Sequence, residues 1–162
     1  MAKATRATQT LEKHRVSFAV HTYEYDPDAQ RTGMQAAEAL GEEPARVLKT
    51  LMALVDGKPV CAIVPSDREV SMKKLAAAFG GKSAQMMKPP DAERLTGYKV
   101  GGISPFGQMR KVPVAMEEAA LAHELVYING GQRGLQVRLA PADAVAVLNA
   151  KTASLITQDR DA

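Results

Sequence analysis

Two apolar runs on either side of Asp56-Gly57 are the feature that most constrains the fold. Residues 49–65 read KTLMALVDGKPVCAIVP, and an Asp-Gly pair between apolar runs is a strong signal for a two-residue hairpin turn. The segment therefore predicts two adjacent antiparallel strands. Because side chains alternate between the faces of a strand, Lys49 is expected on a face that is otherwise apolar.

The other segments mix strand and helix patterns without a βαβ repeat. This order indicates a mixed α/β fold, with a curved, barrel-like sheet and helices outside it. The 162 residues fit one domain, 1–162, in which residues 1–10 and 157–162 are expected to be loosely ordered. A loop is predicted at 26–33. Helices are predicted at 4–14, 34–40 and 72–79 and within 89–97 and 141–150, with a short helical turn from Pro44, and further strands at 17–25, 112–116, 124–130 and 135–140.

Composition and the first residues exclude several classes of protein. No apolar run approaches the length that spans a membrane, and residues 1–16 are basic without the apolar core of a signal peptide. The single cysteine, Cys61, excludes an internal disulfide framework and suits the cytoplasm. Its spacing from the three histidines does not match a metal site, so no metal or other cofactor is expected. The net charge of +3 permits an anionic partner such as RNA.

Four side chains offer chemistry, and each has a structural alternative. Lys49 either extends to solvent from a strand end or reaches into a pocket to hold a phosphate or a developing oxyanion. Tyr23 is either a packed strand residue or a hydroxyl that orients a substrate carbonyl or a water. His21 has no nucleophile near it in the sequence and is interpreted as structural. Cys61 lies among apolar residues, so we predict that it is buried and inert.

Two glycine-rich segments complete the candidate site, GYKVGGISPFGQ at 97–108 and NGGQRG at 129–134. The missing Cβ atoms of Gly101 and Gly102 let a substrate carbonyl approach closely, or let their N–H groups point at it. Arg133 could bind a phosphate. Taken alone, each segment is equally well explained as a tight turn between strands.

These motifs, in this order, resemble the YbaK/EbsC family, whose best-known members are bacterial Cys-tRNA(Pro) deacylases related to the editing domain of prolyl-tRNA synthetases. The resemblance runs from about Leu11 to Ile156. It implies a barrel-like mixed sheet with surrounding helices and a deacylase that acts in trans. It places catalytic roles on Lys49, Tyr23 and Gly101. Substrate contacts are also expected at Thr50, Gly102, Ile103, Ser104, Pro105, Phe106, Asn129, Gly130 and Arg133.

The resemblance also implies a mechanism and partners. In the Cys-specific members, the thiol of the bound cysteine attacks its own ester carbonyl, and the amino acid leaves as a cyclic thiolactone. No cofactor is needed. The implied partners are aminoacylated tRNA(Pro) and prolyl-tRNA synthetase, in the cytoplasm and away from membranes. Nothing in the sequence determines the oligomeric state.

Two positions depart from the family pattern and leave the substrate open. Asn129 and Gln136 stand where many members carry Ser and Asp. One alternative is therefore a deacylase that uses water to clear Ala or another small amino acid from tRNA(Pro). Another is a non-catalytic module that binds tRNA or a synthetase. The basic segment at 108–111 is either a solvated loop or a contact to an acceptor stem.

Overall fold

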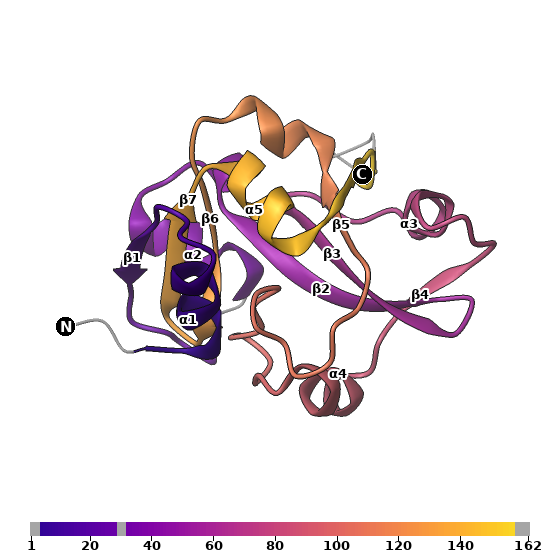
Figure 1. Cartoon of the computed structure of the whole chain (residues 1–162), viewed down its shortest axis with the longest axis horizontal. Coiled ribbons are helices and arrows are strands. Elements are labelled where there is room, and N and C mark those ends of the chain that lie inside the picture. The colour runs from indigo at the N-terminus through magenta and orange to yellow at the C-terminus, as the bar shows by residue number, and fades with distance from the viewer. Residues whose placement is uncertain (1–3, 29–31, 158–162) are drawn as a thin grey trace.

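Two β-sheets form the framework of the computed structural model, which describes residues 4–28 and 32–157 (Figure 1). The smaller sheet is antiparallel throughout, in the order β1-β7-β6. The larger sheet has the order β4-β2-β3-β5-β8, with β3, β5 and β8 mutually parallel. The strands are β1 (Ala19–Thr22), β2 (Leu48–Val55), β3 (Lys58–Pro65), β4 (Ala84–Met86), β5 (Val114–Glu117), β6 (Val126–Gln132), β7 (Leu135–Leu139) and β8 (Lys151–Ala153).

Within residues 4–28 and 32–157, five short α-helices and two 3-10 helices surround these sheets. Figure 1 shows α3 beside the far end of the β2–β3 hairpin and α5 in front of the larger sheet. The mixed α/β prediction is confirmed, although neither sheet of the described residues closes into a barrel. The helices are α1 (Arg6–Lys13), α2 (Thr32–Leu40), α3 (Met72–Ala78), α4 (Pro89–Thr96) and α5 (Pro141–Leu148), with 3-10 turns η1 (Pro44–Arg46) and η2 (Glu118–Ala122).

The hairpin predicted from Asp56-Gly57 is confirmed. The φ angles are +49° at Asp56 and +82° at Gly57, and positive φ at both central residues is what a type I′ turn requires. This turn pairs Val55 with Lys58, and the register continues without interruption along both strands. The turn therefore fixes which β2 side chains face which core.

The alternation predicted for β2 is also confirmed, because its two faces enter different cores. Leu48 and Met52 pack in the larger core between the two sheets. Ala53 and Val55 pack on the opposite face, in a second core covered by α3. Lys49 therefore lies on the same face as Ala53 and Val55 but close to the beginning of the strand, where the cover of α3 ends.

Helix α1 is docked against the larger core, which differs from the loose order expected for residues 1–10. Thr5 caps the helix through a capping box, and its hydroxyl also donates to the Gly130 carbonyl at 2.6 Å. Ala7 and Leu11 are fully buried. Residues 1–3 and 158–162 of the segments expected to be loose, and residues 29–31 of the predicted loop, lie outside the described residues.

Some element boundaries differ from the sequence prediction. The strand expected over 17–25 is limited to Ala19–Thr22, and strands β4 and β8 were not predicted. Each of these two has three residues, which is too few to show a period-2 pattern. In the described part of the chain, no helix is both long and apolar enough to span a membrane.

The docking of α1 gives the first prediction. Replacing Leu11 with Ala should lower the free energy of unfolding by about 2–5 kcal/mol, because it leaves a cavity in the core. Chemical denaturation of the variant and the wild type measures the change. The neighbouring Glu12 is exposed, so Glu12→Ala is the matched control and should stay within about 0.5 kcal/mol. Equal effects of the two changes would show that α1 is not packed as described.

Candidate active site

A cavity of about 290 Å³ opens beside strand β2, between the two sheets. On this side of β2, strand β4 pairs with Ala53–Val55 only, and Val47 makes an isolated bridge to Tyr127 of β6. The intervening part of the β2 edge borders the cavity. The Met52 carbonyl accepts from the Met87 N–H at this edge, so by strand alternation the N–H and C=O of Thr50 also point to this side. The cavity therefore includes backbone hydrogen-bonding groups of a strand.

Lys49 is the one charged side chain among the described residues that line the cavity. Burial lowers the pKa of its ammonium group below the ordinary lysine value, and the carboxylates of Glu69 and Asp67 oppose this shift. These two carboxylates are not part of the cavity lining. The site consequently holds a single, partly desolvated cation and no lining carboxylate to neutralise it.

A row of polar side chains crosses the smaller sheet beneath the cavity. The register pairs Asn129 with Gln136, and Gln136 with His21 on the next strand, so the three side chains share one face of the sheet. Gln136 is only 4% exposed, and its Oε1 atom has no hydrogen-bond partner among the described residues. The Oγ1 atom of Thr50 and the Nε2 atom of His21 are likewise buried and unpartnered. Unmet hydrogen-bonding capacity of this kind is uncommon in protein interiors and indicates a place for a ligand or water.

Tyr23 and Tyr25 follow strand β1 and contribute two hydroxyls to the cavity. Burial raises the pKa of the Tyr23 hydroxyl above its usual value, and Tyr25 adds to the increase. Hydrogen bonding from Gln136 and from the Gly134 backbone opposes the shift. Tyr23 therefore stays a neutral hydroxyl at physiological pH, able to donate one hydrogen bond to a substrate oxygen.

The first glycine-rich segment forms one wall of the cavity at Gly101. This residue has a φ angle of +92°, and a Cβ atom added to it would lie 2.5 Å from the Tyr25 hydroxyl, so only glycine fits. Its carbonyl accepts from the Asn129 side chain at 3.3 Å, whereas its N–H donates to no described residue. The Gly102 N–H is different, because it donates to the Lys99 carbonyl at 2.8 Å. Of the two N–H groups expected to point at a substrate, only that of Gly101 is without a partner among the described residues.

Arg133 joins the two glycine-rich segments to each other. Its Nε–H donates to the Val100 carbonyl at 2.8 Å, and its guanidinium lies 5.4 Å from the centre of the Tyr25 ring. Gly102 is buried directly under this contact, where a Cβ atom would lie 2.7 Å from the Arg133 backbone nitrogen. Neither Arg133 nor Gly102 lines the cavity. The structure assigns both residues to holding the cavity wall, where direct substrate contact had been expected.

Four other expected substrate contacts are buried away from the cavity. Ser104, Pro105 and Phe106 are buried residues of the first glycine-rich segment. Phe106 is fully enclosed in the larger core. The Tyr98 hydroxyl donates to the Phe106 carbonyl at 2.6 Å. Gly130 is also buried, because a Cβ atom there would overlap the Leu135 side chain at 2.1 Å. These four residues support the loop and the sheet, and the cavity surface does not include them.

The cavity thus brings together half of the residues predicted from the sequence. Lys49, Tyr23, Gly101, Thr50, Ile103 and Asn129 line it. The apolar wall, to which Leu51, Met86, Met87, Pro89 and Ala92 contribute, and the contact from Tyr25 were not predicted from the sequence. Tyr25 and Leu51 had a usable signal, because Tyr25 stands two residues after Tyr23 and Leu51 follows Thr50 in the predicted strand. Met86, Met87, Pro89 and Ala92 had none, because the pairing of β4 with β2 brings their segment to the site.

The remaining candidates lie elsewhere. Cys61 is fully buried in the larger core, and burial raises the pKa of its thiol to about 12, which makes it inert as a nucleophile. The ring of His21 packs edge-on against Tyr127 with centroids 5.3 Å apart, which is a structural contact. In the described residues, no cluster of three His, Cys, Asp or Glu side chains is placed to hold a metal ion.

The chain is similar to known proteins over most of its length. A family model described as the aminoacyl-tRNA editing domain matches residues 27–147. EbsC of Enterococcus faecalis, whose name carries a provisional Cys-tRNA(Pro)/Cys-tRNA(Cys) deacylase assignment, is 33% identical over 156 residues, 96% of this chain and 94% of EbsC. Proline–tRNA ligase of Acidithiobacillus ferrooxidans is 32% identical over 91 residues, which cover 56% of this chain but only 16% of the ligase.

Solved structures support the fold. A crystal structure described as a proposed trans-editing enzyme for prolyl tRNA synthetase superimposes with a TM-score of 0.79. The alignment covers 96% of this chain and 99% of that chain at 23% sequence identity. A crystal structure of the protein APE2540 gives a TM-score of 0.82 at 21% identity. At these identities the likeness establishes a shared architecture.

The close packing at Gly102 gives the second prediction. A Gly102→Ala change should lower the free energy of unfolding by about 1–3 kcal/mol, because the added methyl group meets the backbone of residues 132 and 133. Chemical denaturation measures it, with Lys99→Ala as the control in the same loop, because Lys99 is exposed. A change as small as that of the control would mean that the two loops are not in contact.

Proposed function

Because the chain belongs to the aminoacyl-tRNA editing domain family and is an aminoacyl-tRNA deacylase, we propose that it acts on Cys-tRNA(Pro) and uses the thiol of the substrate as the nucleophile. One observation carries this proposal. The described lining of the cavity contains no Cys, Ser or His side chain and no carboxylate. The Thr50 hydroxyl therefore has no His or carboxylate among the described lining side chains to activate it as a nucleophile, and the attacking group is best supplied by the substrate.

The reaction then proceeds within the bound amino acid. The cysteine sulfur attacks the ester carbonyl carbon, so that a C–S bond forms and the carbonyl oxygen becomes an oxyanion. Collapse of this intermediate breaks the bond to the ribose oxygen, which takes up the proton lost by the thiol. The products are a cyclic thiolactone and tRNA with a free 3′ end. Holding the sulfur close to the carbonyl supplies most of the acceleration, because the reaction is intramolecular.

The residues of the cavity have distinct roles in this proposal. The Lys49 ammonium and the Gly101 N–H stabilise the oxyanion, and both act in a partly desolvated site where such interactions are strong. The Tyr23 hydroxyl orients the ester carbonyl. Asn129 and Thr50 hydrogen-bond the polar groups of the amino acid. The terminal adenosine packs along the apolar wall, which is formed by Leu51, Met86, Met87, Pro89 and Ala92.

The observations on the polar row favour one second candidate, a deacylase for Ala or another small amino acid. Gln136 and Thr50 each have a buried oxygen without a partner, and together with Asn129 they could hold a water molecule beside the ester. In that case water, and not a thiol, attacks the carbonyl. The proposed partner in both cases is aminoacylated tRNA(Pro), with prolyl-tRNA synthetase as the source of the mischarged tRNA.

Removal of the Lys49 ammonium tests the site. Lys49→Ala should reduce kcat/KM for deacylation by about 10²–10³-fold, because the oxyanion loses its only cationic partner. Thermal unfolding should change little, since Lys49 forms neither of the two ion pairs found among the described residues. Lys88→Ala is the matched control, because Lys88 is exposed just before α4. If deacylation is unaffected, Lys49 does not have the proposed role. A non-catalytic binding module would show no ester loss even in the wild type.

A panel of charged tRNA(Pro) species separates the two mechanisms. We expect rapid deacylation of the cysteinyl ester and rates lower by several orders of magnitude for the seryl and 2-aminobutyryl esters, because a hydroxyl is a poorer nucleophile and a methyl group cannot attack. Single-turnover assays with each ester give the rates, and mass spectrometry of the products identifies the thiolactone. Equal rates for cysteinyl, alanyl and 2-aminobutyryl esters would instead establish attack by water.

A further inference from the structure

A second and larger hollow lies at the other end of the β2–β3 hairpin, and no step of the proposed reaction uses it. Its volume is about 610 Å³. Four cationic side chains from three distant parts of the chain converge on it: Lys58, Arg110, Lys111 and Lys151. Its base is apolar and includes the buried Val55 and Val60 and the half-buried Phe79. We call this hollow the basic groove.

The positive charge of the basic groove is not neutralised by the protein. Asp56 is the only acidic residue in its lining, and both oxygens of its carboxylate already accept hydrogen bonds from the backbone of Lys82 at 3.1–3.2 Å. The two ion pairs found in the described residues involve none of the four cations. The groove therefore carries a surplus of three positive charges, which is as large as the net charge of the whole chain.

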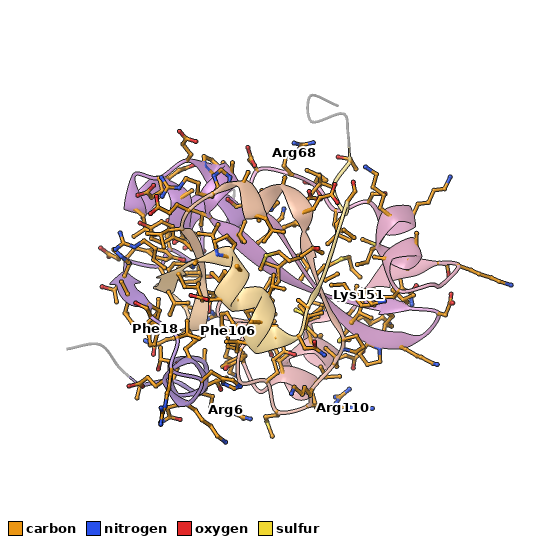
Figure 2. All side chains as sticks on the ribbon, turned by 45° about the horizontal axis from the view of Figure 1, so that its top comes forward. Arg6, Phe18, Arg68, Phe106, Arg110 and Lys151 are labelled. Atoms are coloured by element: carbon orange, nitrogen blue, oxygen red, sulfur yellow. The ribbon has the colours of Figure 1, made fainter. Side chains whose placement is uncertain are left out.

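Two of the cations are held by the fold. The Lys151 ammonium donates to the Ala78 carbonyl at 3.2 Å and lies 5.4 Å from the centre of the Phe79 ring. The backbone N–H of Arg110 donates to the Leu95 carbonyl at the end of α4 at 3.2 Å. Figure 2 shows Arg110 at the periphery of the molecule, where its side chain is accessible. These contacts hold the Lys151 side chain and the Arg110 backbone in place. The side chains of Lys58, Arg110 and Lys111 are exposed and accessible to a ligand.

Strand β2 connects the groove to the active-site cavity. Lys49 lines the cavity and Val55 lines the groove, and six residues of extended strand span about 20 Å. Helix α4 also connects them, because Pro89 and Ala92 line the cavity and Leu95 holds Arg110. Eight helical residues measure about 12 Å. A ligand that occupies the cavity and extends a few nucleotides beyond it can therefore reach the groove.

We propose that the basic groove binds the phosphate backbone of the tRNA whose aminoacylated 3′ end occupies the cavity. This inference rests on the proposed function. The four unpaired nucleotides at the 3′ end of a tRNA cover about 14 Å when stacked at 3.4 Å each and more when extended. The phosphates at the start of the acceptor stem then lie at the distance of the groove. Lysine and arginine side chains that contact phosphates would add affinity without adding sequence preference.

The chemistry of the groove favours RNA over an acidic protein surface. Apart from the Asp56 carboxylate, which accepts from the Lys82 backbone, the charged side chains beside the apolar base are all cationic, and the described lining contains no Asn, Gln, Ser or Thr side chain that would pair with a peptide backbone. A protein interface would bury a continuous apolar patch with aromatic anchors, but here the face of Phe79 is covered by Lys151. The regularly spaced phosphates of an RNA backbone match this arrangement of cations around an apolar base.

The test removes two groove charges and compares them with two charges elsewhere. In the groove variant, Lys58→Gln and Lys111→Gln are combined. In the control variant, Lys13→Gln and Lys73→Gln are combined, and these lysines are also exposed but lie outside the groove. Uncharged tRNA(Pro) is titrated against each protein by fluorescence anisotropy at several salt concentrations. The plot of log K against log salt should become shallower by roughly one for each lost phosphate contact in the groove variant only.

The affinity and kinetic results should follow the same pattern. At low salt, the groove variant should bind tRNA about tenfold more weakly than the control variant, because two counterion-releasing contacts are lost. For a mischarged tRNA, KM should rise while kcat stays unchanged. For an aminoacylated adenosine, which cannot reach the groove, both constants should stay at the wild-type values. Equal salt dependence in the groove and control variants would overturn the proposal, as would a loss confined to binding of prolyl-tRNA synthetase.

Failure of this inference is distinguishable from failure of the proposed function. Binding of uncharged tRNA requires no deacylation, so the titrations decide the role of the groove even if cysteine is not the substrate. Conversely, aminoacylated adenosine reports on the cavity alone. If the aminoacylated adenosine is cleaved normally and the groove variant binds tRNA as tightly as the control variant does, the proposed function stands and the groove inference is wrong.

Discussion

The interruption of strand pairing along one edge of β2 is the constraint on which the site depends. Between the bridge at Val47 and the start of the β4 ladder at Ala53, the strand borders a cavity in place of another strand. A strand edge left unpaired exposes N–H and C=O groups that must find other partners. The two sheets hold this edge open, because the larger core packs between them and fixes their separation. The hairpin turn at Asp56-Gly57 sets the register that decides which side chains reach it.

The glycine-rich loops complete the cavity through close approach of backbone to backbone. Gly101 leaves room for the Tyr25 hydroxyl, and Gly102 lies directly against the backbone of residue 133. Larger residues at either position would separate the loops and widen the cavity. The loops thus determine the dimensions of the site, while Lys49 supplies its charge. This division explains how a site with one cation and no nucleophile can still be selective, since shape and hydrogen bonding at the polar row must discriminate among amino acids.

The parts of the fold that could be predicted are those encoded locally. The Asp56-Gly57 turn and the helix ended by Gly97 depend on a few neighbouring residues, and both agree with the structure. Strand β4 has no local signal, so the apolar wall beside it could not be anticipated. The step of the polar row from Gln136 to His21 depends on pairing between segments more than a hundred residues apart, which no single segment encodes. Phe106 was assigned to the site because its segment is rich in Gly and Pro, although its side chain fills the core.

The electrostatics of the cavity also constrain how the amino acid can bind. An α-ammonium group placed at the polar row would lie in the same partly desolvated cavity as the Lys49 ammonium, with no lining carboxylate to offset the repulsion. A neutral amine avoids this cost and can still donate hydrogen bonds to the unpartnered oxygens of Gln136 and Thr50. Burial already lowers the pKa of Lys49, so a second positive charge would lower it further and weaken the oxyanion contact. The arrangement therefore favours the uncharged form of the amino group, which leaves Lys49 as the only cation beside the ester.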